Sequence, residues 1–91
     1  MSQDPEVSVV VVNHNRASLL SRCLASLQSQ TFKAFEILVV DNASTDASVR
    51  FVEERFSSVR IVHSGGTVGP ACARNLGMRE AKNRWVLAVD N

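Results

Sequence analysis

The sequence predicts an α/β fold, a doubly wound and mainly parallel four-stranded sheet of order 3-2-1-4 flanked by helices. Three observations predict it. Short runs rich in Val and Ile alternate with longer segments whose apolar residues recur at helical spacing. The first run is nearly all Val, which is typical of a strand buried on both faces of a parallel sheet. The alternation continues without a repeat or a linker, so we expect residues 1–91 to form a single domain with right-handed crossovers.

Four runs have the composition of strands, and we expect them at residues 7–12, 37–40, 59–62 and 85–89. The third is broken by Arg60. Between the first two strands, apolar residues from Leu19 to Leu27 lie on one helical face, with Asn15 or Ser18 as the expected cap. The second helix is expected at 49–56. The third is expected to begin at Pro70, which suits a first helical turn, and to contain Gly77 as a weak point.

Composition excludes several classes of protein. With 45% hydrophobic and 21% charged residues the chain is globular rather than disordered. Ten basic and nine acidic residues give a net charge of +1 without a basic stripe, so we expect no nucleic-acid partner. No apolar run approaches the ~20 residues of a membrane span, and the opening residues do not resemble an export signal, so a cytoplasmic protein is expected. Cys23 and Cys72 show no metal-ligand spacing and are interpreted as reduced core thiols.

Polar residues or glycine follow every predicted strand. Carboxyl ends of parallel strands meet at one edge of a sheet, where ligands bind in folds of this type. Asp41 therefore lies at the expected crevice, although it could instead tie its own loop in an Asx turn. His14 could be an ordinary loop imidazole, and Arg74 a surface cation, although a cation near a helix N-terminus favours a nearby anion. The four segments expected at this edge are 13–15, 41–44, 64–66 and 90–91.

A dinucleotide fingerprint competes for the same crevice. Residues 64–69 read S-G-G-T-V-G, which is G-x-G-x-x-G with Ser64 in the first position, and Asp90 follows about 20 residues later. However, the missing glycine is the one that makes the tight turn, and the motif follows the third strand rather than the first. A receiver domain would need an acidic pair after the first strand, where this chain has Asn13, His14 and Asn15.

The order and spacing of the motifs resemble the start of a family 2 glycosyltransferase with the Rossmann-like GT-A fold. The resemblance spans nearly the whole chain. It rests on a strand ending in N-x-N-R, an L-x-x-x-L-x-S-x-x-x-Q-T helix exit and an F-E-I-x-V-V-D strand followed by S-T-D. A G-x-x-x-A-R-N-x-G helix then precedes a strand that, in this family, ends in a D-x-D metal motif.

The resemblance implies which residues bind a nucleotide sugar. The loop after the first strand would pack on the nucleobase, with His14 where many relatives have Tyr. Asp41 would bind the base edge, in a segment that is often D-D-G-S and here reads D-N-A-S, without the second acid and the glycine. Asp90 would be the first acid of D-x-D, whose second acid would follow Asn91. The expected nucleotide-binding residues are Val12, Asn13, His14, Asn15, Asp41, Asn42, Ser44, Gly69, Arg74 and Asn75, and the expected metal ligand is Asp90.

The family implies transfer of a sugar from a nucleoside diphosphate donor, such as a UDP- or dTDP-sugar, to an acceptor hydroxyl. A Mg²⁺ or Mn²⁺ ion would stabilise the departing diphosphate. The chain is expected to be the donor-binding part of a longer parent, cut at D-x-D and inactive alone, with the parent near the inner face of a membrane. The exposed edge of the fourth strand is expected to allow self-association. A non-catalytic nucleotide- or dinucleotide-binding α/β module is the alternative.

Overall fold

The computed structural model describes residues 6–30 and 35–89. Within these ranges four strands and three helices alternate, as the hydrophobic pattern predicts. Several elements extend one or two residues beyond the predicted limits, because the pattern marks buried positions rather than backbone pairing. No helix in the described ranges is long and apolar enough to cross a membrane. The elements are β1 (Val7–Asn13), α1 (Ala17–Gln28), β2 (Phe35–Asp41), α2 (Ser48–Arg55), β3 (Arg60–His63), α3 (Pro70–Glu80) and β4 (Trp85–Val89).

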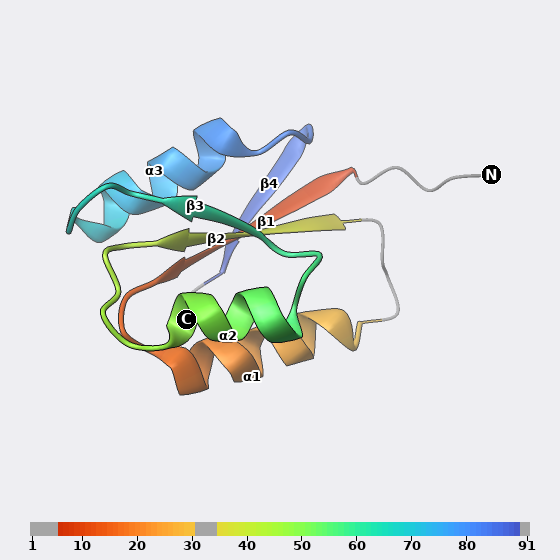
Figure 1. Cartoon of the computed structure of the whole chain (residues 1–91). Coiled ribbons are helices and arrows are strands. Elements are labelled where there is room, and N and C mark those ends of the chain that lie inside the picture. Colours follow the sequence, from red (N-terminus) through yellow and green to blue (C-terminus); the bar gives the residue numbers. More distant parts are fainter. Residues whose placement is uncertain (1–5, 31–34, 90–91) are drawn as a thin grey trace.

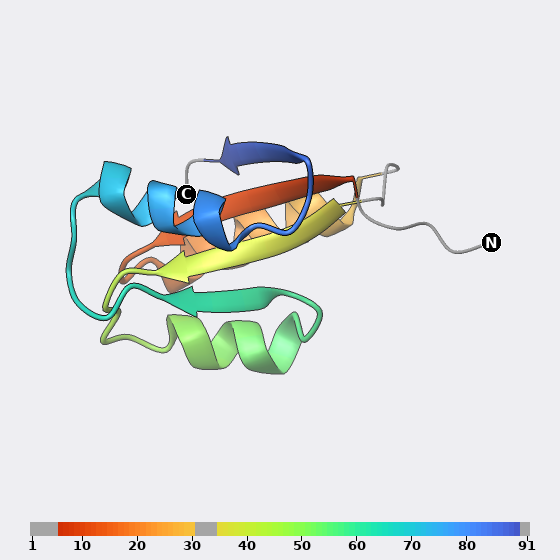
Figure 2. The same cartoon turned by 90° about the horizontal axis from the view of Figure 1, so that it is seen from above.

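The strands form one parallel sheet in the order β3-β2-β1-β4, which confirms the predicted topology. Helices α1 and α2 cover one face of the sheet and α3 covers the other (Figure 1). The view from above shows that α3 lies over the central strands and runs roughly along them (Figure 2). The loops that follow β1, β2 and β3 lie together at the left end of the molecule in Figure 1, at the carboxyl edge of the sheet.

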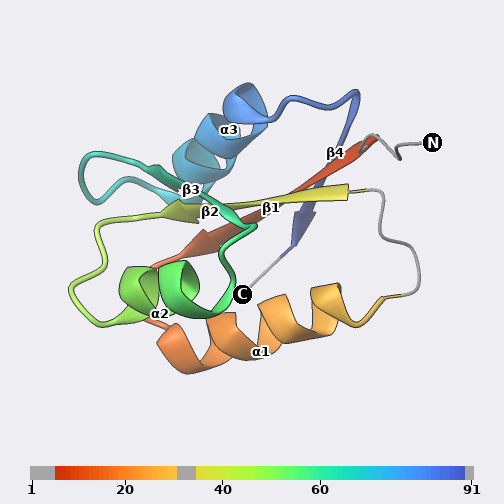
Figure 3. The same cartoon turned by 45° about the vertical axis from the view of Figure 1, so that its right-hand side comes forward.

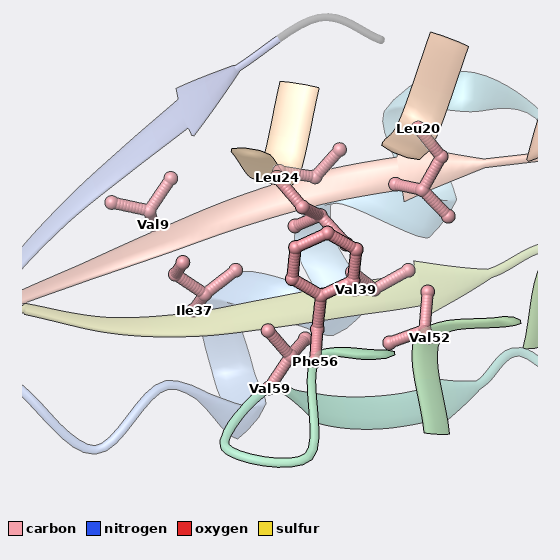
Figure 4. Close-up of a cluster of buried hydrophobic side chains, with 9 residues drawn as sticks. Val9, Leu20, Leu24, Ile37, Val39, Val52, Phe56 and Val59 are labelled. Carbon is pink, nitrogen blue, oxygen red and sulfur yellow. The ribbon is translucent and has the colours of Figure 1, made fainter. Parts of the chain in front are cut away.

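Each face of the sheet has its own apolar core. Consecutive residues of β1 alternate between the two cores, and Val9, Val10 and Val11 are all buried, as the all-Val run predicts. The core under α3 is smaller and contains Val10, Val40 and Ala73. The larger core, under α1 and α2, contains Val9, Val11, Leu20, Leu24, Ile37, Val39, Val52, Phe56 and Val59 (Figure 4).

Helix α3 contacts the sheet through its smallest residues. The prediction that Cys72 is a core thiol is wrong, because Cys72 is exposed and the buried residues of this helix are Ala73 and Gly77. Cys23 is half-buried, and burial raises the pKa of its thiol. A Cβ atom on Gly77 would clash with Val10 Cγ1 and lie 2.8 Å from Val40 Cγ2. Gly77 is therefore not simply a weak point, because it lets the helix approach the sheet closely.

The outer strand β4 is largely exposed. Trp85 and Leu87 are 63% and 55% exposed and pair with Val7 and Val9 of β1. They therefore lie on the α1 side of the sheet, where Leu87 lines an open apolar cleft together with Leu27 and others. Figure 3 shows β4 at the side of the sheet away from α2. The expected exposed edge is present, and self-association through it stays a prediction.

A polar network lies at the amino end of the strands, opposite the carboxyl edge, and joins β1, β2 and the segment between α3 and β4. Glu36 Oε1 accepts hydrogen bonds from Ser8 Oγ (2.6 Å) and from the backbone N–H of Lys82 (3.0 Å). Asn83 Nδ2 donates to Ser8 Oγ (3.1 Å). Partial burial acts to raise the pKa of Glu36, but the bonds from Ser8 and Lys82 and the charges of Arg60 and Lys82 outweigh it, so the pKa is lowered.

Two loop residues at the carboxyl edge have left-handed backbone conformations. Asn15 has φ +50° and Ala43 has φ +57°. Asn tolerates this region through its side chain, whereas Ala has no such compensation and is strained there.

We expect Gly77→Ala to destabilise the protein. The added methyl group must displace the stiff side chains of Val10 and Val40, which costs roughly 1 to 3 kcal/mol, against a gain in helix propensity of about 1 kcal/mol. Urea unfolding measures the change. Gly66→Ala is the control, because a Cβ there meets nothing within 4 Å. Equal stability of the two variants would contradict close packing at Gly77.

The lowered pKa of Glu36 predicts a pH-dependent contribution to stability. A depressed folded-state pKa stabilises the protein above the unfolded value of about 4.3, and the contribution is lost as pH falls through the folded-state value. Glu36→Gln should therefore be less stable than wild type at pH 7 and lose less stability between pH 5 and pH 3. Urea unfolding at a series of pH values checks this, with Glu53→Gln on α2 as the control. Parallel curves for wild type and Glu36→Gln would refute it.

Ala43→Gly should stabilise the protein by roughly 0.5 to 1 kcal/mol. Relief of the left-handed strain exceeds the added entropy of the unfolded chain. The same change at Ala25, in the exposed face of α1, should instead cost about 1 kcal/mol. Thermal unfolding of both variants measures the difference, and a destabilised Ala43→Gly protein would show that the strain is absent.

Candidate functional site

Three neighbouring strands end in polar residues at the same level of the sheet. Asn13 of β1 pairs with Asp41 of β2, and Asp41 pairs with His63 of β3. Residues paired in register point to the same face, so these three side chains lie in a row on the side of α1 and α2. The site expected at the strand ends is therefore assembled around Asp41.

The carboxylate of Asp41 is 4% exposed and held on two sides. Its Oδ2 accepts a hydrogen bond from the backbone N–H of Ser44 (3.1 Å), which is the loop-tying role that the sequence left open. Among the described residues, its Oδ1 accepts one long bond, 3.4 Å, from Asn13 Nδ2, which also donates to Ser44 Oγ (3.2 Å). A carboxylate oxygen can accept more than one bond, so Oδ1 retains capacity for a stronger donor.

An open cleft of about 430 Å³ lies beside Asp41, between the end of β2, the start of α2 and the end of β3. Two of the lining residues, His63 and Val49, are not among the site residues that the sequence predicts. His63 could have been found by the reasoning that selected Asp41, because it is the last residue of its strand, but the strand was expected to end at Val62. The cleft is lined by Asp41, Ala43, Ser44, Val49, His63, Gly65 and Gly66.

Asn42 is 6% exposed and turned towards the loop after β3. Its Nδ2 donates to the carbonyl of Val68 (2.8 Å), and its Oδ1 accepts from the N–H of Val68 (3.0 Å) and from Ser64 Oγ (3.1 Å). The backbone carbonyl of Asn42 lies 2.5 Å from His14 Nδ1. A carbonyl can only accept, so Nδ1 of His14 carries a proton and donates to it.

Asn15 and Asp46 join the loops after β1 and β2. The side chain of Asn15 accepts bonds from the N–H groups of Thr45 (2.6 Å) and Asp46 (3.1 Å). Asp46 accepts from the N–H of Ala17 (3.3 Å) and the N–H of Ser48 (3.0 Å), the first residues of α1 and α2. A bond from the Ser48 hydroxyl is the main reason that the pKa of Asp46 is lowered.

The N-cap that the sequence predicts for α1 is wrong. The N-cap of α1 is Arg16, without a side-chain capping bond, rather than Asn15 or Ser18. The negative charge of Asp46 lies at the N-termini of both helices, where the helix dipole stabilises a negative charge. Ser44 does not cap α2, because its hydroxyl accepts from Asn13 and from the N–H of Asn15 (3.0 Å).

The remaining predicted residues lie elsewhere along the same edge. Val12 packs against the core under α3, on the opposite face from Asp41. Gly69 precedes the first residue of α3, and Arg74 is half-buried in that helix. Asn75 lines a separate open hollow with Cys72, Met78 and Arg79. The structure thus brings Asn13, Asp41 and Ser44 into direct contact and leaves Asn75 outside the cleft.

Asp90, the expected metal ligand, lies outside the described residues. Within residues 6–30 and 35–89, no three His, Cys, Asp or Glu side chains are grouped so that they could hold a metal ion. Asp41 is surrounded by amide and hydroxyl groups, which suit an organic ligand with N–H and C=O groups.

Comparison with known proteins identifies the family. The model of glycosyl transferase family 2 matches residues 8–91. The uncharacterized glycosyltransferase YibD of Escherichia coli is 32% identical over 93 residues, covering 99% of this chain and 27% of its own length. A poly(ribitol-phosphate) beta-glucosyltransferase of Bacillus spizizenii is 35% identical over 95 residues, covering 94% of this chain and 14% of its own length.

Solved GT-A structures have the same fold. TarS 1-349 of S. aureus, in complex with UDP, superposes with a TM-score of 0.85 at 31% identity, covering 93% of this chain and 27% of TarS 1-349. The mannosyltransferase PcManGT of Pyrobaculum calidifontis, in complex with GDP-Man and Mn²⁺, has a TM-score of 0.81 at 30% identity. The match covers 96% of this chain and 27% of PcManGT. The chain thus spans between 14% and 27% of the length of these four proteins, and it belongs to glycosyl transferase family 2.

Proposed function

We propose that the chain binds the nucleotide part of a nucleoside diphosphate sugar, and that the intact protein transfers the sugar to an acceptor hydroxyl. The observation that supports this most is the position of Asp41 in a family 2 chain. Its nearly buried carboxylate lines a cleft at the carboxyl edge of a parallel sheet, where ligands bind in open α/β folds. The solved neighbours in complex with UDP and GDP-Man support the same class of ligand.

The carboxylate of Asp41 matches the N–H of uracil or thymine. Such a base presents one N–H between two carbonyl groups. Asp41 Oδ1 can accept from the N–H, while the amide of Asn13 holds the carboxylate in place and bonds to Ser44 Oγ. A charge-assisted bond at a nearly buried site is stronger than a neutral one, so the carboxylate would provide most of the base selectivity.

The proposal includes a divalent cation, with Asp90 as its expected ligand. Hard oxygen ligands suit Mg²⁺ or Mn²⁺, and PcManGT is in complex with Mn²⁺. When bound, such an ion neutralises the diphosphate that leaves with the nucleotide. The described residues contribute no grouped metal ligands, so their proposed part is to hold and orient the nucleotide.

The choice between UDP and CDP tests the role of Asp41. Cytosine has an acceptor where uracil has its N–H, so we expect wild type to bind UDP more tightly than CDP. Asp41→Asn keeps the size of the side chain and removes the charged acceptor. The substitution should weaken UDP binding roughly 10- to 100-fold, which corresponds to the free energy of one hydrogen bond to a charged group, and it should reduce the preference for UDP over CDP.

Isothermal titration calorimetry with each nucleotide measures both effects. Glu36→Gln is the matched control, because it also neutralises a hydrogen-bonded carboxylate but at the amino end of the sheet. Unchanged UDP preference in Asp41→Asn would refute recognition of the base by Asp41. No UDP binding by the wild-type chain would refute nucleotide binding itself.

A further inference from the structure

Asn42 connects the three loops at the carboxyl edge. Its backbone N–H donates to the carbonyl of Asn13 (2.8 Å), and its carbonyl accepts from His14 in the loop after β1. Its side-chain amide bonds to Ser64 and Val68 in the loop after β3. Every polar group of this residue is therefore engaged, and the side chain makes three bonds to one loop.

Only an amide can make this set of bonds. The side chain donates to the carbonyl of Val68 and accepts from its N–H, so it pairs with the backbone of Val68 on two sides. A carboxylate has no proton to donate and would face the Val68 carbonyl with a lone pair. An acid at this position could not hold the loop in the same way.

The loop held by Asn42 forms one wall of the cleft. Residues 64–69 run from the end of β3 to the start of α3, and Gly65 and Gly66 line the cleft opposite Ala43 and Ser44. Glycines have no side chains to fix such a wall, and Gly65 has φ +83°. The Ser64 hydroxyl, which has one proton, lies within hydrogen-bond distance of both the Gly66 carbonyl and Asn42 Oδ1, and Asn42 also secures Val68.

We propose that Asn42 is a positioning residue that holds the loop 64–69 as the wall of the nucleotide cleft without touching the nucleotide. Its side chain is 6% exposed, and both its oxygen and its nitrogen bond to the loop after β3, which leaves Asp41 to contact the base. The inference rests on the proposed function in one respect, that the cleft beside Asp41 holds the nucleotide.

Hydrogen exchange separates this role from nucleotide binding. In Asn42→Ala, which deletes the three side-chain bonds, the Val68 amide should exchange about tenfold faster, as expected for the loss of roughly 1.4 kcal/mol of local stability. Asn42→Asp, of nearly equal size, removes only the donor and tests the bond to the Val68 carbonyl. Asn83→Ala is the control, because it removes an amide bond to Ser8 at the far end of the sheet.

Nucleotide binding completes the test. We expect Asn42→Ala and Asn42→Asp to bind UDP and CDP more weakly by the same factor, about three- to tenfold, so that the preference for UDP is kept. Unchanged Val68 exchange in Asn42→Ala, or faster exchange with unchanged UDP affinity, overturns the proposal. A changed UDP preference overturns it as well, because it would mean that Asn42 contacts the base.

The two proposals fail in different ways. If the wild-type chain does not bind UDP, the proposed function fails, and the exchange of Val68 still shows whether Asn42 holds the loop. If Asn42→Ala does not fold, Asn42→Asp carries both measurements. Loss of UDP preference in Asp41→Asn together with its retention in both Asn42 variants is the result that supports both proposals.

Discussion

Buried polar residues at the ends of β1 and β2 organise the carboxyl edge of this protein. Asn13, Asp41 and Asn42 are 1%, 4% and 6% exposed. Removing such groups from water is costly unless each finds hydrogen-bond partners. Their partners come from the loops after β1, β2 and β3, so satisfying these side chains also fixes the relative positions of the loops.

The two sides of this edge are held by different chemistry. On one side, the carboxylate of Asp46 accepts hydrogen bonds from the first N–H groups of α1 and α2, and Asn15 accepts a hydrogen bond from the backbone N–H of Asp46. On the other side, the neutral amide of Asn42 pairs with the backbone of Val68. Asp41 lies between them, and within the described residues its Oδ1 accepts one long bond of 3.4 Å, which suits the proposed role of this oxygen as an acceptor for the ligand.

Periodicity was sufficient to predict the order of the sheet, because a parallel β/α alternation permits few topologies. It predicted 85–89 as a strand and the buried run of β1 correctly. It was wrong about Cys72, because Cys72 lies one residue from the contact stripe of α3 that Ala73 and Gly77 form. The role of Gly77 depends on the distance between α3 and the methyl groups of Val10 and Val40, which no local pattern encodes.

At the site, strand ends and family resemblance together selected Asp41, Asn13 and Ser44, which the structure brings into contact. The alternation of a strand turns Val12 to the face of α3, away from Asp41, and its part in nucleotide binding stays a prediction. Asn42 looked like an incomplete acidic pair in the sequence. Its bonds join residues more than 20 positions apart, so only the folded chain shows why an amide stands there.

The strain at Ala43 follows from the same arrangement. Asp41 must turn its carboxylate towards α2 while Asn42, the next residue, turns its amide towards the loop after β3. The chain then has to return to Ser44, whose N–H and hydroxyl both bond back to the end of the sheet. A left-handed residue at position 43 makes that reversal. Backbone strain of about 1 kcal/mol is small beside the cost of leaving Asp41 or Asn42 without partners, so the hydrogen bonds determine the conformation of the turn.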